Sequence, residues 1–390
     1  MSKNSIPAVR FCDFSDNWES KKIGDLGSVS MNKRIFKEET SEVGEIPFYK
    51  IGTFGSEPDS FITREKFEEY KSKYPYPEIG DILISASGSI GRTVEYQGEE
   101  AYFQDSNIVW LTHDERLDNS FLKQFYSIVK WEGIEGTTIK RLYNKNILET
   151  PISLPSQEEQ SAIGSLFRTL DDLLSSYKDN LTNYQALKAT MLSKMFPKAG
   201  QTVPEIRLDG FEDRWEEKEF IQIVNRVTES SDSDALPKVE FEDIISGQGK
   251  LNKDISSKFD NRKGILFKPG YTLYGKLRPY LNNWLLPKFE GVALGDFWVF
   301  DPNGNNSDFI YYLVQSSRYQ KVANDTSGTK MPRSDWKSVS TTVFAIPQTI
   351  TEQQAIGSYF SNLDNLINSH QEKISQLETL KKKLLQDMFI

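Results

Sequence analysis

The sequence predicts an α+β protein in which two similar globular bodies alternate with two long helices. Three observations support this class. One segment of the chain recurs 193 positions later, the phrase that opens each body recurs after 197 positions, and both recurring segments carry a seven-residue apolar repeat. A repeat on this scale indicates one supersecondary unit that is built twice. We therefore expect two mixed α/β bodies in a pseudo-twofold arrangement.

Each body opens on the same pattern of proline, cation and tryptophan. The sequence PAVRFCDFSDNWESK at residues 7–21 returns as PEIRLDGFEDRWEEK at residues 204–218. We expect this phrase to begin equivalent domains, the first over residues 1–155 and the second over residues 201–346.

Short aromatic and β-branched runs between glycines predict the strands of the two bodies. These runs lie at residues 80–87, 101–112, 270–277 and 297–300. Short helices are predicted between them, at residues 64–73, 120–130 and 308–317. Runs of this length and variety are typical of an irregular α+β body.

The two recurring segments predict long spacer helices over residues 156–200 and 347–390. Ser156 and Thr349 are the expected N-caps, and each has a glutamate three positions later, which is the capping-box pattern.

The apolar residues of both segments fall into columns seven residues apart. The columns are Leu170, Tyr177, Tyr184 and Met191 beside Phe167, Leu174 and Leu181, and then Leu363, His370, Leu377 and Leu384 beside Phe360, Ile367 and Ile374. His370 is expected to be a packing residue in its column and not a ligand. Heptads of this length predict a coiled coil, and a pseudo-twofold repeat requires its helices to be antiparallel. About 40 residues at a rise of about 1.5 Å give a rod of roughly 60 Å. The alternative is that each helix packs only on its neighbouring body.

Composition excludes several classes of protein. Cys12 is the only cysteine, which excludes an internal disulfide and a cysteine-rich zinc site. No apolar run approaches the roughly 20 residues of a spanning helix, and residues 1–11 lack the apolar stretch of a signal peptide, so we expect a cytoplasmic protein without a membrane partner. A net charge of −9 argues against nucleic-acid binding, but a basic surface on one side of a protein can coexist with acidic residues on the other side.

Two pairs of turns carry candidate binding residues. The turn SGSIGR at residues 87–92 has a counterpart, YGKLRPY, at residues 274–280, and both place cations beside glycine. Glycine lets a backbone approach a surface closely, so the neighbouring side chains can reach phosphates or base edges. The candidates here are Ser87, Ser89, Arg92, Lys276, Arg278 and Tyr280.

The second pair of turns precedes the long helices. GTTIKRLY at residues 136–143 matches GTKMPRSDW at residues 328–336, and the candidate DNA-binding residues are Lys140, Arg141, Lys330 and Arg333. The alternative for any single residue is an ordinary solvated turn. The occurrence of the same chemistry at the same place in both bodies favours a binding role.

Catalytic motifs are scarce. The chain has two histidines, His113 and His370, and it has neither a phosphate-binding loop nor a methyltransferase tetrad. The pattern of Asp59, Glu69 and Lys71 resembles the metal-binding acids and lysine of a nuclease. This pattern occurs once, in a highly charged stretch, and it leaves a self-contained nuclease as a weaker alternative. No catalytic residue, metal ligand or cofactor site is predicted in the chain.

With these motifs together, the chain resembles the specificity (S) subunit of Type I restriction–modification enzymes. The resemblance rests on LPSQEEQSAIGSLFRTLDDLL at residues 154–174, its partner IPQTITEQQAIGSYFSNLDNLI at residues 346–367, the LKxxxLxxMF helix ends, and the two opening phrases. It covers essentially the whole chain, and its helix motif is the specific part.

The resemblance implies a non-catalytic DNA-recognition subunit. Each body would be a target recognition domain for one half of a split double-stranded DNA site, and the helices would fix the spacer and dock two modification subunits. Those partners would carry S-adenosylmethionine, and restriction or motor subunits would use ATP and magnesium. Residues 136–143 lack the proline and tryptophan of their counterpart, so the two bodies are expected to read different half-sequences. A structural coiled-coil adaptor is the other alternative.

Overall fold

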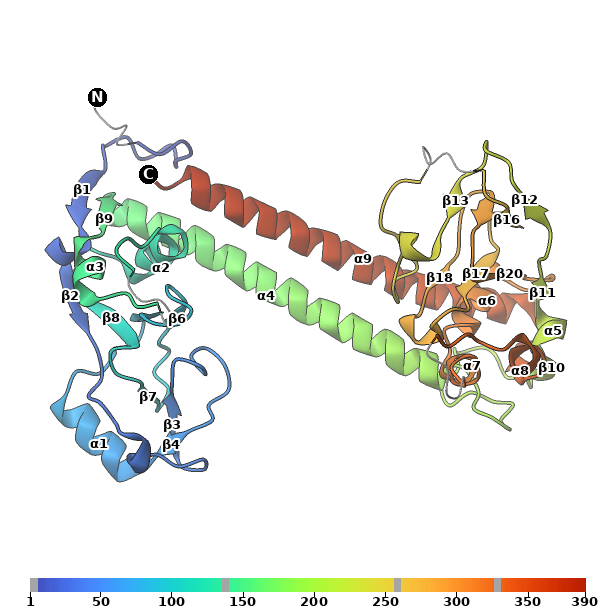
Figure 1. Cartoon of the computed structure of the whole chain (residues 1–390), viewed down its shortest axis with the longest axis horizontal. Helices are drawn as coiled ribbons and strands as arrows, with labels where there is room; N and C mark the ends of the chain where they lie inside the picture. Colours follow the sequence, from blue (N-terminus) through green and yellow to red (C-terminus); the bar gives the residue numbers. More distant parts are fainter. Residues whose placement is uncertain (1–5, 135–139, 256–260, 326–330) are drawn as a thin grey trace. The chain divides into compact units, whose positions relative to one another are not determined.

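The computed structural model describes residues 6–134, 140–255, 261–325 and 331–390. The chain forms two compact units: unit 1 comprises residues 1–177 with 373–390, and unit 2 comprises residues 178–372. Both unit boundaries fall inside the long helices, so each unit holds one globular body and a stretch of each helix (Figure 1). We call residues 18–155 body 1 and residues 215–346 body 2.

Body 1 is built on two small sheets. The first is antiparallel and has the strand order β2 (Gly27–Ser30), β8 (Ile108–His113), β5 (Ile82–Ser85), β6 (Thr93–Glu95). The second has the order β4 (Phe61–Ile62), β3 (Ile46–Tyr49), β7 (Tyr102–Phe103). The helices are α1 (Arg64–Lys73), α2 (Asn119–Ile128) and α3 (Asn144–Glu149), with 3₁₀ turns η1 (Ile23–Asp25) and η2 (Lys37–Glu39).

Body 2 repeats the first sheet and enlarges the second. The first sheet has the order β11 (Asn225–Arg226), β20 (Phe297–Asp301), β17 (Thr272–Gly275), β18 (Trp284–Leu285). The second has the order β12 (Ser230–Ser231), β16 (Gly264–Phe267), β19 (Gly291–Ala293), β13 (Lys238–Val239), and a hairpin joins β14 (Ile244–Ile245) to β15 (Lys250–Leu251). The helices are α5 (Phe220–Ile223), α6 (Ser307–Leu313), α7 (Ser317–Ala323) and α8 (Trp336–Ser340), with 3₁₀ turns η3 (Phe241–Asp243) and η4 (Pro279–Leu281).

Each body is closed by pairing its first strand with its last. In body 1, β1 (Glu19–Lys22) runs antiparallel to β9 (Pro151–Leu154), and in body 2, β10 (Glu216–Glu219) runs antiparallel to β21 (Val343–Ile346). The last strand leads directly into a long helix. The start of each body and the start of its helix are therefore held together.

Two predicted elements are each divided into two in the structure. The predicted strand at residues 101–112 is two strands, β7 and β8, because Ser106 adopts a positive φ of 51° between them. The predicted helix at residues 308–317 ends at Leu313, because the Ser316 hydroxyl accepts a hydrogen bond from the Tyr319 amide and caps a new helix.

The long helices are α4 (Gln157–Lys194) and α9 (Ile350–Asp387), each of 38 residues. Ser156 and Thr349 cap them as predicted: each hydroxyl accepts a hydrogen bond, at 3.3 Å, from the amide three residues later. The capping-box prediction is wrong for the second half of the box. The carboxylate of Glu159 binds side chains of the opening phrase instead of turning back to the cap.

A three-residue cluster fixes each opening phrase to its helix. Both oxygens of Glu159 accept from the Arg10 guanidinium, at 2.6 and 2.7 Å, and Oε2 also accepts from the Trp18 indole at 3.1 Å. In unit 2 the counterparts Arg207 and Trp215 donate to Glu352 in the same way, at 2.7 to 3.0 Å. The repeated opening sequences therefore make the same contacts with their helices in both units.

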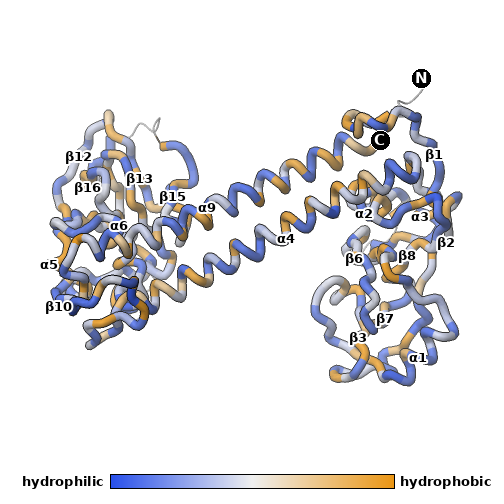
Figure 2. The backbone as a smooth tube through the Cα atoms, turned by 180° about the vertical axis from the view of Figure 1, so that it is seen from behind, coloured by the Kyte–Doolittle hydropathy of each residue, from blue (hydrophilic) through white to orange (hydrophobic). Residues whose placement is uncertain are grey.

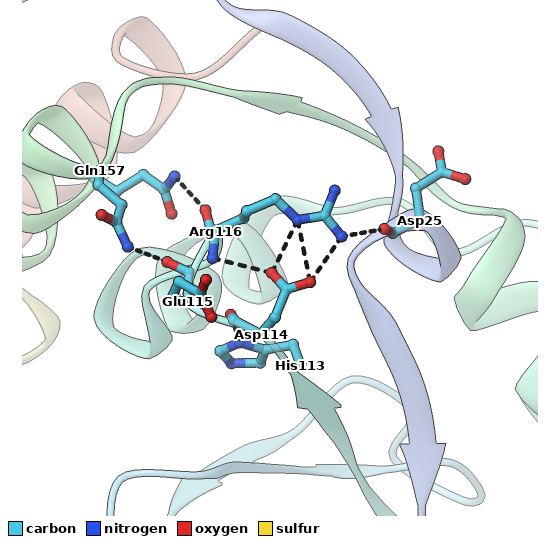
Figure 3. A network of polar contacts seen from close by, with 7 residues as sticks. Asp25, His113, Asp114, Glu115, Arg116 and Gln157 are labelled. Atoms are coloured by element: carbon cyan, nitrogen blue, oxygen red, sulfur yellow. Dashed lines mark hydrogen bonds and ion pairs between the residues drawn. The ribbon is translucent and has the colours of Figure 1, made fainter.

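A second network joins the sheet of body 1 to α4 (Figure 3). The Arg116 guanidinium donates to the Asp114 carboxylate and, at 2.7 Å, to the Asp25 carbonyl. The same guanidinium holds the pKa of Asp114 at about 2. The Gln157 side-chain amide, in the first turn of α4, donates to the Glu115 carbonyl. The end of β8 is thereby tied to the start of the helix.

The two helices run antiparallel within each unit. In unit 1 the Asp387 carbonyl near the end of α9 accepts from the Val9 amide at 2.9 Å, and the Phe389 ring stacks on Phe121 at 5.2 Å. In unit 2 the Lys194 carbonyl accepts from the Ile206 amide at 3.0 Å. Each helix thus starts on one body and ends in the unit of the other.

Ion pairs across the helices repeat with the same spacing as the sequence. Lys381 pairs with Asp171 in unit 1, and Lys188 pairs with Asp364 at 2.6 Å in unit 2. The predicted heptad columns are buried or half-buried along both helices, and hydrophobic and hydrophilic stretches alternate along them (Figure 2). The predicted antiparallel coiled coil is confirmed, since each helix packs on the other as well as on a body. None of the helices in the described part of the chain is long and apolar enough to span a membrane.

Candidate nucleic-acid interface

The two candidate turns of each body lie next to each other. Ser87 forms an isolated antiparallel bridge with Arg141, and Leu277 forms the same bridge with Arg333. The Leu142 amide also donates to the Ala86 carbonyl at 2.8 Å. Segments that are about 50 residues apart in the chain therefore form one surface feature in each body. We call this feature the bridge site, made of residues 86–92 and 140–142 in body 1 and residues 276–282 and 331–334 in body 2.

In body 1 the central strands β5 and β8 position the bridge site. Ser87 is buried, and its hydroxyl donates to Asn107 Oδ1 at 2.7 Å, so it holds the turn and does not face solvent. Ser89 and Arg92 are exposed, and the Arg92 amide donates to Ser85 Oγ at 2.9 Å. No side-chain partner of Arg92 is found among the described residues.

The second segment of this site carries Lys140 and Arg141. Lys140 is exposed. The Arg141 guanidinium donates to Ser106 Oγ at 2.7 Å and lies over the Tyr143 ring at 5.9 Å. The half-buried Arg141 is therefore engaged by other protein groups, whereas Lys140 and Arg92 are exposed and have no side-chain partner among the described residues.

In body 2 one carboxylate organises the bridge site. The Arg333 guanidinium donates to both oxygens of Asp296, at 3.0 and 3.2 Å, and Lys276 Nζ lies 3.7 Å from Asp296 Oδ1. The hydrogen bond from Arg333 lowers the pKa of Asp296. Arg278 and Tyr280 are exposed at the tip of the turn. Lys330, the remaining candidate, lies outside the described residues.

Sequence reasoning missed the segment that supports both bridge sites. Ser106 and Asn107 precede β8, Asp296 precedes β20, and they bind Arg141, Ser87 and Arg333 respectively. The only sequence signal is a polar turn directly before a strong strand, which is too common to identify a site. Their importance follows from contacts between distant parts of the chain.

The nuclease pattern does not converge on a metal site. Asp59 pairs with Lys50 at 2.8 Å, Glu69 pairs with Lys73 at 3.0 Å, and the Lys71 ammonium lies over the rings of Phe67 and Tyr76. Within the described ranges no group of three or more histidine, cysteine, aspartate or glutamate residues is placed to hold a metal ion. These charges form ordinary surface pairs around α1.

The family profile described as Type I restriction modification DNA specificity domain matches residues 15–184 and 218–379. These two matches cover most of the chain and coincide with the two copies of the repeat. The chain belongs to this family. It is the specificity subunit of a Type I restriction–modification system and functions in DNA sequence recognition. The sequence prediction of a non-catalytic recognition subunit is confirmed by this membership, and neither alternative gains support.

Curated relatives agree with the family. A putative specificity subunit, S.HindORF215P of Haemophilus influenzae, is 54% identical over 161 residues, a match that covers 41% of this chain and 42% of that protein. The MjaVIII specificity subunit of Methanocaldococcus jannaschii is 21% identical over 95% of this chain and 91% of its own length.

Solved structures share the fold. The S subunit of a Type I system from M. genitalium matches with a TM-score of 0.63 at 16% identity, over 99% of both chains. A second structure, from a study of complex assembly and conformational transition of the Type I system, matches with a TM-score of 0.52 at 13% identity, over 95% of this chain and 97% of the other.

Proposed function

We propose that each body of this specificity subunit reads one half of a bipartite double-stranded DNA site through its bridge site. The observation that carries the proposal is the same bridge in both bodies, Ser87 with Arg141 and Leu277 with Arg333, each beside an exposed cation. Two similar readers on one chain suit a target that consists of two separated half-sequences. The chain as a whole carries a net charge of −9, so binding to DNA must come from such local positive groups.

The candidate residues divide by their contacts into two roles. Arg92, Lys140, Arg278 and Tyr280 are exposed and available to DNA. Arg141, Lys276 and Arg333 bind Ser106 or Asp296 and hold the turns in place. Ser87 belongs to the second group, whereas the exposed Ser89 sits at the tip of its turn beside the DNA-facing residues.

The coiled coil is the proposed ruler and docking platform. A helix of 38 residues at about 1.5 Å per residue is about 57 Å long, and this length is what the proposal makes responsible for the spacer between the half-sites. Each helix also exposes two leucines, and each of these leucines comes one residue before a position of the heptad column that contains Phe167 or Phe360. They are Leu173 (42% exposed) and Leu380 (45%) in unit 1, and Leu187 (40%) and Leu366 (41%) in unit 2.

These leucines form two matched apolar patches. The ion pair between Asp171 and Lys381 brings Leu173 and Leu380 to similar heights on the antiparallel helices. Equivalent heptad positions on antiparallel partners lie on the same side of a coiled coil. Paired exposed leucines on an otherwise polar surface suit a protein partner. We propose one modification subunit per patch, hence two per chain.

The proposed partners supply the chemistry. S-adenosylmethionine would be held by the modification subunits, and ATP and magnesium by the restriction or motor subunits, all acting on DNA in the cytoplasm. This chain would contribute sequence recognition, orientation and spacing.

Salt-dependent binding of the assembled complex tests the proposed DNA face. Charge reversal of Arg92 or Lys140 should weaken binding and lower the slope of log K against log salt by about 0.9 for each lost phosphate contact. Lys288, an exposed cation at the opposite end of β18 from the turn, offers a matched reversal that should leave both quantities unchanged. Equal slopes in all variants would refute the bridge site as the DNA face.

A further inference from the structure

In both bridge sites the residue that follows the bridge has a positive φ, but the side chain at that position differs between the two bodies. Gly88 follows the bridge residue Ser87 and has a φ of 65°. At the same place in body 2, Arg278 follows Leu277 and has a φ of 46° and a ψ of 62°. Glycine adopts this left-handed conformation freely, whereas for arginine it is unfavourable. Body 2 therefore holds an arginine where body 1 uses the residue that the backbone prefers.

The protein around Arg278 imposes this conformation. Its amide donates to the Pro332 carbonyl at 2.7 Å, and its carbonyl accepts from the Leu281 amide at 2.8 Å. The next residue, Pro279, is buried and opens a short 3₁₀ turn. A residue before proline ordinarily adopts an extended conformation, so Pro279 adds to the strain at Arg278. The backbone of Arg278 is thus fixed at both of its polar groups.

The guanidinium, by contrast, has no partner among the described residues, and the side chain is exposed. The two other cations of this bridge site, Lys276 and Arg333, are both turned to Asp296. Arg278 is therefore a strained residue whose charged end contributes no contact to the fold. A strained backbone conformation whose side chain makes no contact within the fold indicates a functional role for that residue.

We propose that Arg278 is the base-reading residue of body 2 and that it recognises a guanine. An exposed guanidinium on a rigid turn can donate two parallel hydrogen bonds to O6 and N7 of guanine in the major groove, a geometry that a flexible phosphate contact does not need. Because the backbone of Arg278 is fixed, the direction in which its guanidinium leaves the turn is restricted, which favours this paired hydrogen bonding. The inference rests on the proposed function and adds one base to it.

Body 1 has no side chain at this position, because Gly88 occupies it. Its half-sequence must then be read by other groups of its bridge site. The asymmetry between Gly88 and Arg278 gives a physical reason for the two bodies to prefer different half-sequences.

The test is selection of preferred sites from randomised DNA by the chain assembled with its modification subunits. The wild-type chain should show guanine at one position of one half-site. Arg278→Gly keeps the backbone conformation, so the chain should fold at least as stably, while discrimination at that position should fall from about 10- to 100-fold to almost none. All other positions and the spacer should stay unchanged.

Two further variants separate base reading from charge. Arg278→Lys keeps the positive charge but cannot donate the two parallel hydrogen bonds of a guanidinium. This variant should lose most of the preference for guanine while retaining the salt dependence of binding. Lys288→Gly removes an exposed cation of body 2 at the far end of β18 and should read DNA as wild type does.

An unchanged preference in Arg278→Gly would overturn the inference, as would loss of preference at a base other than guanine. A uniform loss of affinity for all sequences with a smaller salt slope would identify a phosphate contact and would also overturn it. In each case the wild-type chain would still select a bipartite site. Failure of the wild-type complex to select any such site would instead refute the proposed function.

Discussion

Single side chains fix the bodies to the helices. Glu159 is buried and accepts hydrogen bonds from Arg10 and Trp18, and Glu352 does the same for Arg207 and Trp215. A carboxylate in the first turn of α4 thus anchors a phrase about 150 residues away in the chain. Removing its charge leaves an arginine that is itself largely buried without its partner.

We therefore predict that Glu159→Gln lowers the free energy of unfolding by about 3 kcal/mol, as for other broken buried pairs. The neighbouring Glu158 is exposed, so Glu158→Gln is a matched control that should change stability by less than about 0.5 kcal/mol. Chemical unfolding followed by circular dichroism measures both. Equal stabilities for the two variants would contradict the anchoring role of Glu159.

Asp296 makes stability depend on pH in a defined direction. Arg333 lowers the pKa of Asp296 below its ordinary value of 3.8. The pair therefore stabilises the folded chain above about pH 4, and this contribution disappears as pH falls through the lowered pKa. Because Arg333 is half exposed, water screens the pair, so this contribution should be a small part of the total stability.

Unfolding of the wild-type chain and of Asp296→Asn, compared from pH 3 to pH 7, tests this direction. The wild type should be more stable at neutral pH, and the difference should shrink towards pH 3. A difference that is constant over the whole range, or that grows in acid, would show that the ion pair is not its cause.

The sequence predicted which cations lie in the candidate turns, but it did not predict which of them are engaged by other protein groups. Glycine and cations in matching turns identified Arg92 and Arg278, which are indeed exposed. The same pattern did not distinguish them from Arg141 and Arg333, whose partners Ser106 and Asp296 lie about 35 residues away in the chain. Local composition reports which charges are present, whereas tertiary contacts decide which of them are free.

At the scale of elements, the long helices were predicted best because their signal is long. A heptad repeat over some 40 residues specifies the helix, its buried face and its partner together. Two-residue strands such as β12 and β13 carry no periodicity, and they form only because β16 and β19 lie between them. The register of the coiled coil also required the structure, through the pairs of Asp171 with Lys381 and Lys188 with Asp364.

The exposed leucines give a prediction at the same scale. Leu173→Arg combined with Leu380→Arg should reduce the assembled complex from two modification subunits per chain to one, because only one of two apolar patches is changed. Ser175→Arg, on the outer face of α4, is the matched control and should keep both. Mass measurement of the purified complexes distinguishes these results. Two bound subunits in the leucine variant would exclude this patch as a docking site.

At the scale of the whole molecule, the pairing of α4 with α9 means that the two helices must be lengthened together to test whether they set the spacer. An insertion in α4 alone would break the register set by the ion pairs. Seven residues added after Asn180 and seven after its repeat counterpart Lys373 preserve the heptads and add about 10.5 Å to both helices. We predict that the spacer of the recognised site grows by about three base pairs, at about 3.4 Å each.

The half-sequences should stay the same in this double insertion. Mapping of methylated sites in DNA exposed to the complex measures the spacer directly. An unaltered spacer in a folded and active variant would show that the helices do not set the distance.

The proposed function requires each body to read its own half of the site. Each body begins and ends at neighbouring strands, β1 with β9 and β10 with β21, so it can be replaced at one junction. The most direct measurement is the methylation motif produced by the complex when residues 18–155 are replaced with the corresponding body of a related specificity subunit. One half of the motif should change, while the other half and the spacer should remain. A folded, active exchange that alters both halves, or neither, would contradict it.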